Sequence, residues 1–420
     1  MTFTQRQKDI YSAGFRGDLP SISTRVDLLE AMAQKKLSTK AFNFIAGGAG
    51  REDCLTNNKA AFSKWSIVPR VLTGKTNCST EITLFNSKHD YPFLLAPIGM
   101  QDLAHKDAEV GVAKAASAQN IALCLSTQAS TPMETVAKVM GNKARWFQLY
   151  WSTNLEFNES LVKRAQNCGC SAIVVTLDTQ MLGWRTRDLD LASLPVYQLS
   201  GIAQYLSDPI VQALIDSNLA QSESQNDDKN LSLLFNLIRI SYKYPGNFFK
   251  NITSMKAVKA LQAIATIARG KELTWQNIVD LRKVTKLPIV VKGILSPADA
   301  KLALEYGIDG IIVSNHGGRQ LSSCVASLDC LRDVAAVAKG KVPILMDSGI
   351  QGGDDIFKAI ALGADAVMIG RPYLYALAIA GEKGVSELLQ NLKAEFELTM
   401  MLSGCATVSD ITQSMLRRVD

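Results

Sequence analysis

The sequence predicts an α/β protein whose main domain is a (β/α)8 barrel, or TIM barrel. Eight short runs rich in Val, Ile, Leu and Phe each end in polar or glycine-rich residues. Helical patterns lie between the runs, and most run starts are about one strand-helix unit apart. The runs are continuously apolar rather than alternating, as in parallel strands that are buried on both faces.

The eight strands and the helices between them can be placed in order. Strands are expected at residues 91–100, 120–130, 144–151, 171–180, 287–295, 310–318, 342–350 and 364–372. Helices are expected at residues 107–119, 158–168, 296–307, 328–340 and 353–364. An open, doubly wound sheet is the main alternative. It is disfavoured because the dinucleotide fingerprint G-x-G-x-x-G is missing after the first strand.

Two regions lie outside the regular barrel pattern. Residues 1–90 are predicted to be an N-terminal helical segment that packs on the barrel. Within it, the stretch 25–50 is expected to be helical to about Ile45 and to break at the glycines that follow. Residues 91–420 are assigned to the barrel domain.

The second irregular region, 188–272, is a long insertion between the fourth and fifth strands. Long loops over a barrel mouth are often lids, so the insertion is predicted to be a lid or a subunit interface. Its polar patch at 220–230 is expected to be a mobile loop tip. A membrane contact through its aromatic and lysine residues is the alternative use of this region.

Composition excludes several classes of function. The net charge of +6 suits an anionic substrate or cofactor, but there is no basic run with interleaved aromatics, so no nucleic-acid partner is expected. The N-terminus lacks the apolar core of a signal peptide, and no run approaches the ~18 apolar residues of a membrane span. A cytoplasmic location with reduced thiols is expected. Cys168 and Cys170 have no second pair at zinc spacing, so no metal site is predicted.

The predicted strand ends carry a set of residues with a common chemical logic. In this fold, the carboxyl ends of the strands face the active site. His316 could accept a proton, Asp178 could orient it, and Lys292 would supply a fixed positive charge. Arg185 and Arg319 offer planar donors for a carboxylate. Each residue alone has a structural explanation, but their joint placement favours a catalytic site.

Several motifs extend this interpretation. The segments "APIGM", "FQLY", "LDTQMLGWRTRD", "VVKG", "SNHGGRQL" and "IGRP" occur in this order along the chain. Together they resemble the FMN-dependent (S)-2-hydroxy acid oxidase and dehydrogenase family, from about residue 25 to the C-terminus. The resemblance implies FMN as cofactor and a small 2-hydroxy acid as substrate. Relatives in the family commonly form tetramers or octamers, so a homo-oligomer is expected.

The resemblance also implies a role for each residue. His316 is the base and Asp178 its partner; Arg185 and Arg319 hold the substrate carboxylate, and Tyr150 contacts its hydroxyl. Phe44 stands where the family usually has a tyrosine that meets the carboxylate. The cofactor-binding residues implied are Pro97, Gly99, Ser126, Gln148, Thr176, Lys292, Ser314, Asp347, Gly349, Gln351, Gly370 and Arg371.

Two departures from the family pattern affect the expected binding. Phe44 keeps the ring but loses a hydroxyl, which removes a hydrogen bond worth ~1 kcal/mol and favours a more apolar substrate. Gln351 replaces an arginine that contacts the FMN phosphate in the family. Arg371 is then expected to carry the electrostatics of phosphate binding, with FMN held less tightly.

The branch of the family is a separate prediction. The segment "GWRTRDLDL" followed by "GIAQYLSDPIV", the long insertion and Gly99 most resemble lactate 2-monooxygenase. That enzyme converts lactate and oxygen to acetate, carbon dioxide and water. Oxygen is therefore the expected electron acceptor. The alternatives are a lactate or 2-hydroxy acid oxidase that releases hydrogen peroxide, a quinone-linked dehydrogenase, and a barrel that binds a phosphorylated ligand without redox turnover.

Overall fold

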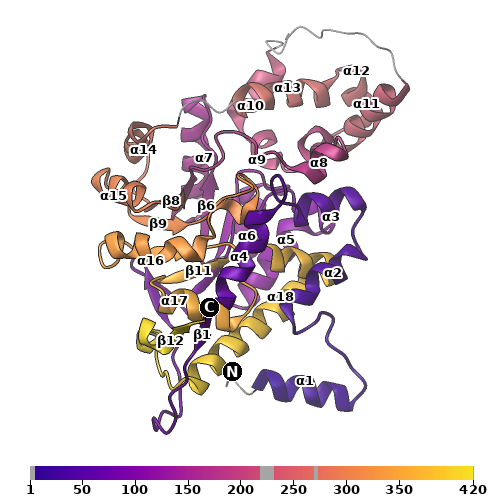
Figure 1. The fold of residues 1–420 in the computed structure, drawn as a ribbon. Coiled ribbons are helices and arrows are strands. Elements are labelled where there is room, and N and C mark those ends of the chain that lie inside the picture. The colour runs from indigo at the N-terminus through magenta and orange to yellow at the C-terminus, as the bar shows by residue number, and fades with distance from the viewer. Residues whose placement is uncertain (1–4, 218–230, 269–272, 420) are drawn as a thin grey trace.

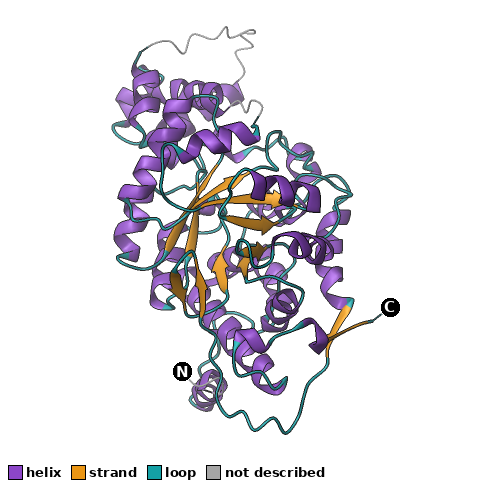
Figure 2. Cartoon of the chain, turned by 90° about the vertical axis from the view of Figure 1, so that its left-hand side faces the viewer, coloured by secondary structure: helices purple, strands orange, loops and turns teal. Residues whose placement is uncertain are grey.

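The computed structural model describes residues 5–217, 231–268 and 273–419. Within these residues, eight parallel strands form a closed barrel surrounded by helices (Figure 1, Figure 2). The last strand pairs with the first, so no edge remains open. The predicted barrel is confirmed, and the open sheet is wrong. The strands are β4 (Phe93–Leu95), β5 (Leu123–Ser126), β6 (Arg145–Leu149), β7 (Ile173–Thr176), β8 (Ile289–Ile294), β9 (Gly310–Val313), β10 (Ile344–Met346) and β11 (Ala366–Ile369).

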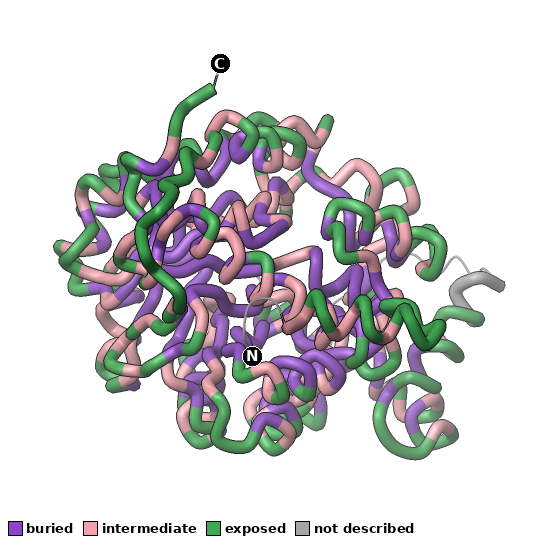
Figure 3. The backbone as a smooth tube through the Cα atoms, turned by 90° about the horizontal axis from the view of Figure 1, so that it is seen from below, coloured by how far each residue is buried: buried purple, intermediate pink, exposed green. Residues whose placement is uncertain are grey.

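The barrel strands are buried on both faces, which explains their continuous apolar runs. Leu94, Trp146 and Val174 pack together inside the barrel. Phe93 and Leu95, on the opposite face of β4, belong to the larger cluster between the barrel and its helices. Figure 3 shows the buried segments at the centre and the exposed ones around the outside.

Helices alternate with the strands as predicted. Local capping explains several of their starts: the Ser296 side chain accepts a hydrogen bond from the Ala298 N–H, and Pro297 occupies the first helical position. Each helical stretch expected between the strands overlaps one of these helices. They are α5 (Ala108–Ala118), α6 (Met133–Met140), α7 (Leu155–Asn167), α14 (Trp275–Arg282), α15 (Pro297–Glu305), α16 (Ser327–Ala338), α17 (Gly353–Ala361) and α18 (Arg371–Leu402).

The N-terminal segment differs from the expectation of one helix reaching Ile45. It contains α1 (Gln5–Phe15), α2 (Leu29–Gln34), α3 (Thr39–Ala46) and α4 (Asp53–Ser63). The chain breaks between α2 and α3 because Ser38 caps a new helix, its side chain accepting from the Ala41 N–H. Helix α3 then ends before Gly47, where the glycines were expected to break it.

Residues 1–90 are also not entirely helical. The strands β2 (Ile82–Leu84) and β3 (Ser87–His89) form an antiparallel hairpin. Leu84 joins the cluster inside the barrel, and the Phe85 ring lies 5.5 Å from that of Trp146. Another short pair, β1 (Trp65–Ile67) with β12 (Leu416–Arg418), joins this segment to the end of the chain. The hairpin plugs the end of the barrel where the strands begin, which leaves the carboxyl ends for chemistry.

The insertion after β7 lies beyond one end of the barrel, at the top of Figure 1. The predicted polar patch at 220–230 lies outside the described residues. Among those described, no helix is both long enough and apolar enough to span a membrane. The insertion contains α8 (Thr186–Asp190), α9 (Ala203–Leu206), α10 (Pro209–Asp216), α11 (Leu231–Lys243), α12 (Phe248–Thr253) and α13 (Lys256–Ala268).

Candidate active site

The loops that follow the barrel strands contain unusual backbone conformations. Met100, His316 and Ser348 follow β4, β9 and β10, and each has a positive φ, of 57°, 57° and 82°. Residues other than glycine rarely adopt this left-handed region, and such strain clusters at functional sites. Three such positions after barrel strands favour the carboxyl end of the barrel as the candidate active site.

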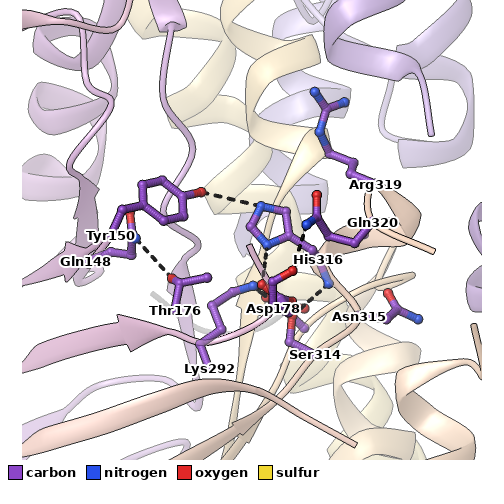
Figure 4. A network of polar contacts seen from close by, with 12 residues as sticks. Gln148, Tyr150, Thr176, Asp178, Lys292, Ser314, Asn315, His316, Arg319 and Gln320 are labelled. Carbon is purple, nitrogen blue, oxygen red and sulfur yellow. Dashed lines mark hydrogen bonds and ion pairs between the residues drawn. The ribbon is translucent and has the colours of Figure 1, made fainter. Parts of the chain in front are cut away.

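His316 and Asp178 form the central pair of the site (Figure 4). His316 Nδ1 lies 2.9 Å from Asp178 Oδ1. The Tyr150 hydroxyl lies 3.5 Å from His316 Nε2, on the other side of the ring. With Asp178 accepting a hydrogen bond from Nδ1, Nε2 is free to act as a base toward the cavity.

The electrostatics keep His316 neutral and Asp178 ionised. Burial and the nearby Lys292 lower the pKa of His316, although Asp178 opposes them. Burial alone would raise the pKa of Asp178, but His316 and Lys292 outweigh it and lower that pKa. A neutral imidazole beside a fixed carboxylate is the arrangement that a general base needs.

Lys292 is buried at the end of β8 but remains charged. Its ammonium lies 3.1 Å from a carboxylate oxygen of Asp347 and donates to the Ser314 hydroxyl at 2.7 Å. Burial disfavours the ammonium, yet Asp347 and Asp178 raise the pKa of Lys292 overall. The site therefore contains a permanent positive charge in a region with little water.

A row of polar side chains crosses the ends of β5, β6 and β7. Gln148 donates to the Thr176 hydroxyl at 3.0 Å, and Ser126 donates to the Gln148 amide oxygen at 3.1 Å. All three side chains are buried. Buried polar groups in a barrel otherwise lined with apolar residues indicate a polar, planar ligand.

The carboxyl end of α3 holds two of the site's arginines. Arg319 donates to the Phe44 and Gly47 carbonyls at 2.6 and 2.9 Å. Arg371, at the start of α18, also donates to the Gly47 carbonyl, at 2.9 Å. The last carbonyls of a helix lack partners within it, so they attract guanidinium groups. Arg185 is a third arginine here and donates to the Arg319 carbonyl at 3.4 Å.

These three arginines make the cavity electropositive. Burial, together with Arg185 and Arg371, holds the pKa of Arg319 well below its usual value. The hydrogen bonds that these guanidinium groups donate to the backbone of Phe44, Gly47 and Arg319 all end on neutral carbonyl oxygens. An anion bound between them would stabilise charges that now repel one another, which is the property expected of a carboxylate and phosphate site.

One cavity, here called the inner cavity, joins most of the predicted site residues. Five others do not line it. Ser126, Gln148 and Thr176 are hydrogen-bonded in a row. Asp178 is paired with His316, and Ser314 accepts a hydrogen bond from Lys292. The predicted residues that line the inner cavity are Phe44, Pro97, Gly99, Tyr150, Arg185, Lys292, His316, Arg319, Asp347, Gly349, Gln351, Gly370 and Arg371.

The residues present fit FMN. The amide and hydroxyl row and Lys292 match an isoalloxazine ring, which is planar and rich in acceptors. At the other end of the cavity, Gly370 and Arg371 begin α18, where helix N-terminal amides favour a phosphate. Tyr375 lines the same cavity, and its buried hydroxyl has no hydrogen-bond partner among the described residues. Tyr375 is therefore a donor left available for a ligand.

Sequence reasoning missed several cavity residues. Tyr375 lies four residues after Arg371 in α18, so helical spacing could have identified it. Gln128 and Ser348 also line the cavity, close to predicted positions. Lys59 carried no signal, because nothing in the sequence placed α4 beside the barrel mouth.

Comparison with known proteins agrees with this geometry. A family model described as FMN-dependent dehydrogenase matches residues 33–418. The chain belongs to this family. The predicted cofactor, FMN, and the predicted class, an FMN-dependent 2-hydroxy acid oxidoreductase, are confirmed. Among the described residues, no cluster of three or more His, Cys, Asp or Glu could hold a metal ion.

Individual relatives cover nearly the whole chain. An L-lactate oxidase of Lysinibacillus sphaericus is 38% identical over 94% of this chain and 92% of its own. An FMN-dependent alpha-hydroxy acid dehydrogenase of Penicillium citrinum is 36% identical over 100% of this chain and 97% of its own. The crystal structure of mandelate oxidase is similar with a TM-score of 0.76 and 33% identity, covering 94% of this chain and 98% of that one.

Proposed function

We propose that the protein oxidises (S)-2-hydroxy acids to 2-oxo acids and passes the electrons to oxygen, releasing hydrogen peroxide. One observation carries the proposal: His316, which is paired with Asp178, lines the same cavity as Arg185 and Arg319. A 2-hydroxy acid has a carboxylate next to the carbon that is oxidised. The arginines would hold the carboxylate, and the imidazole would act at the carbon that is oxidised.

The residues divide the work as follows. Arg185 and Arg319 bind the carboxylate, and Tyr150 orients the hydroxyl toward His316. His316 Nε2 accepts one of the two hydrogens as a proton, and Asp178 stabilises the imidazolium that forms. Bound FMN supplies the two-electron chemistry.

The remaining polar residues would hold that cofactor. Ser126, Gln148 and Thr176 would bond the ring, and Lys292 would place its charge beside it. Asp347 and Ser314 position Lys292. The cofactor phosphate would lie near Gly370 and Arg371, with Gly349 and Gln351 on the facing loop. The strand-end residues Pro97 and Gly99 would lie behind the ring.

Packing accounts for Gly99 without reference to the family branch. A Cβ added at Gly99 would stand 2.4 Å from the backbone oxygen of Gln128, closer than any side chain tolerates. Glycine is therefore needed here whichever reaction follows. The monooxygenase interpretation then depends on the insertion and on the segments "GWRTRDLDL" and "GIAQYLSDPIV", and we favour the oxidase.

A second cavity, here called the outer cavity, indicates the substrate side chain. It shares Phe44, Tyr150 and Arg185 with the inner cavity and continues between residues of the insertion, including Val196 and Tyr205. Phe44 cannot hydrogen-bond a carboxylate, and its ring lies 4.8 Å from the Arg319 guanidinium instead. We therefore expect substrates with an apolar chain longer than the methyl group of lactate.

Product stoichiometry tests the reaction. The FMN-loaded protein is mixed with L-lactate or 2-hydroxyoctanoate in air, and oxygen, hydrogen peroxide, 2-oxo acid and carbon dioxide are measured together. Equal amounts of peroxide and 2-oxo acid support the oxidase. Carbon dioxide that matches oxygen uptake, without peroxide, would make it a monooxygenase in which the insertion retains the product. Reduction of a quinone with no oxygen uptake would make it a dehydrogenase.

A substrate series tests the side chain. Burying a methylene is worth ~0.8 kcal/mol, so kcat/KM should rise about fourfold per added carbon while the chain fits the outer cavity. The series runs from L-lactate to 2-hydroxyoctanoate, with (S)-mandelate as the aromatic member. A kcat/KM that falls steadily from lactate onward would contradict the assignment of the outer cavity.

A further inference from the structure

Two cysteine thiols meet beside the catalytic loop. Cys54 lies in the first turn of α4, and Cys324 lies five residues after Arg319. Each thiol lies close enough to the other to affect its charge state. The backbone holds their segments together, because the Cys54 N–H donates to the Ser322 carbonyl at 2.7 Å and the Arg51 N–H donates to the Ser322 hydroxyl at 3.0 Å.

The two thiols differ in reactivity. Cys54 is fully buried, whereas Cys324 is partly exposed. The neighbouring Cys54 thiol lowers the pKa of Cys324 to about 7, although burial opposes it. The same contact, together with burial, raises the pKa of Cys54. Thiolates are the reactive form of cysteine, so Cys324 is suited to attack an oxidant and Cys54 to resolve the product.

The pair is connected to the catalytic residues. Asn58, one turn after Cys54, exchanges two hydrogen bonds with Asn315, of 2.9 and 2.7 Å. Asn315 immediately precedes His316. Cys324 is also close enough to Asp178 for that carboxylate to affect its charge state. A peroxide that leaves the active site would therefore be formed near this thiol pair.

We propose that Cys324 and Cys54 form a peroxide-reactive dithiol that the enzyme's own product oxidises. The Cys324 thiolate attacks one oxygen of hydrogen peroxide, which breaks the O–O bond and gives a sulfenic acid and hydroxide. The Cys54 thiol then displaces the sulfenic oxygen, forming an S–S bond. Overall, two thiols and one hydrogen peroxide give one disulfide and two waters. The source of the peroxide rests on the proposed function; the thiol chemistry does not.

Mass spectrometry of the native holoenzyme tests the pair. The protein is treated with hydrogen peroxide, and free thiols are blocked before digestion. The digest is searched for two peptides joined through Cys54 and Cys324, whose combined mass is two hydrogens below the sum of the separate peptides. We expect this disulfide to be the first to form and to disappear with dithiothreitol. Cys78, which is also partly exposed, is the matched control: a Cys78→Ser variant should form the disulfide as the unaltered chain does.

A resolving-cysteine variant tests the order of the steps. In Cys54→Ser, the oxidation should stop at a Cys324 sulfenic acid, which dimedone captures. In the unaltered chain, burial raises the pKa of Cys78 above its ordinary value, so at pH 7 its thiolate fraction is at least about 50-fold below that of Cys324. Lower basicity reduces nucleophilicity by less than about tenfold, so Cys324 should react at least about fivefold faster than Cys78. Equal labelling of the two cysteines, or no Cys54–Cys324 disulfide in the unaltered chain, would overturn the proposal.

A turnover arm separates this proposal from the proposed function. The enzyme is supplied with 2-hydroxy acid and air, with or without catalase, in place of added peroxide. Disulfide formation that catalase suppresses supports both proposals. If added peroxide forms the disulfide but turnover does not, self-oxidation by the product is overturned, while the dithiol chemistry remains in place. That result would point to a reaction that releases no peroxide.

Discussion

His316 can accept a proton only while its imidazole is neutral. Burial and Lys292 lower its pKa from the ordinary 6.5, so the neutral form persists into mildly acidic solution. Because activity is lost as pH falls through this pKa, kcat/KM should decline on the acid side with a midpoint below 6.5. A pH-rate profile with 2-hydroxy acids that are oxidised slowly measures this midpoint. A midpoint above 6.5 would contradict the arrangement.

Asp178 is the group that opposes this lowering. Its charge raises the pKa of His316, so Asp178→Asn should move the acid midpoint to still lower pH and weaken the base. We expect kcat/KM to fall by about 10²-fold or more, within the range for a disabled general base. Asp190→Asn, an exposed change in the same region, is the control and should leave both the rate and the midpoint unchanged.

Gln351 tests how the phosphate is bound. It lines the inner cavity without a charge, so Gln351→Arg should tighten FMN binding by about tenfold, as a charge-assisted hydrogen bond is worth ~1.5 kcal/mol or more. Quenching of flavin fluorescence measures the affinity. Riboflavin, which lacks the phosphate, is the control ligand. Equal tightening for riboflavin and FMN would show that the residue does not face the phosphate.

At the scale of elements, β8 positions the catalytic pair through a glycine. Gly293 has a φ of 112°, next to an irregularity in the pairing of β8 with β9, and an added Cβ would lie 2.9 Å from the Asp178 Cβ. Gly293→Ala should displace Asp178 and lower kcat more than it raises KM. Gly307→Ala is the matched control, since Gly307 also has a positive φ but faces open space. Equal losses of kcat in the two variants would assign the effect to backbone strain alone.

The sequence predicted elements wherever one apolar pattern dominates. The barrel strands are buried on both faces, so their runs stand out. The helical patterns between them were equally clear. The break between α2 and α3 was missed because Ser38 acts only locally, through its side-chain cap. The β2–β3 hairpin was missed because Leu84 is buried by the barrel interior rather than by its own neighbours.

The site residues could be predicted because they follow the strands directly. Placing His316 and Asp178 required only the positions of two strand ends. Lys59 could not be placed, since its approach to the cavity depends on how α4 packs beside the barrel. The thiol pair of Cys54 and Cys324 depends on contacts between segments that are 270 residues apart, which no local pattern encodes.

At the scale of the whole molecule, the insertion exposes aromatic side chains. Phe235, Tyr242 and Phe249 are 65%, 79% and 73% exposed on α11 and α12. Exposed apolar groups of this size mark contact surfaces, and we expect them to be buried in a homo-oligomer. Light scattering should give an oligomer for the unaltered chain and a smaller species for a Phe235→Ser, Phe249→Ser variant.

The control for that assembly is Phe15→Ser, a substitution of an even more exposed aromatic on α1. It should leave the mass unchanged. Flotation with anionic vesicles tests the membrane alternative. A monomer that floats with the vesicles would contradict the assembly and assign these aromatics to a lipid surface.

The most direct test of the central claim is the reduction of bound FMN in the absence of oxygen. The flavin absorbance of the holoenzyme is followed after mixing with its best 2-hydroxy acid, for the unaltered chain and for His316→Gln. We expect the flavin of the unaltered chain to bleach rapidly. The His316→Gln variant should retain FMN, but its flavin should be reduced at least about 10²-fold more slowly. Reduction of the variant at the unaltered rate would contradict the assignment of His316 as the base.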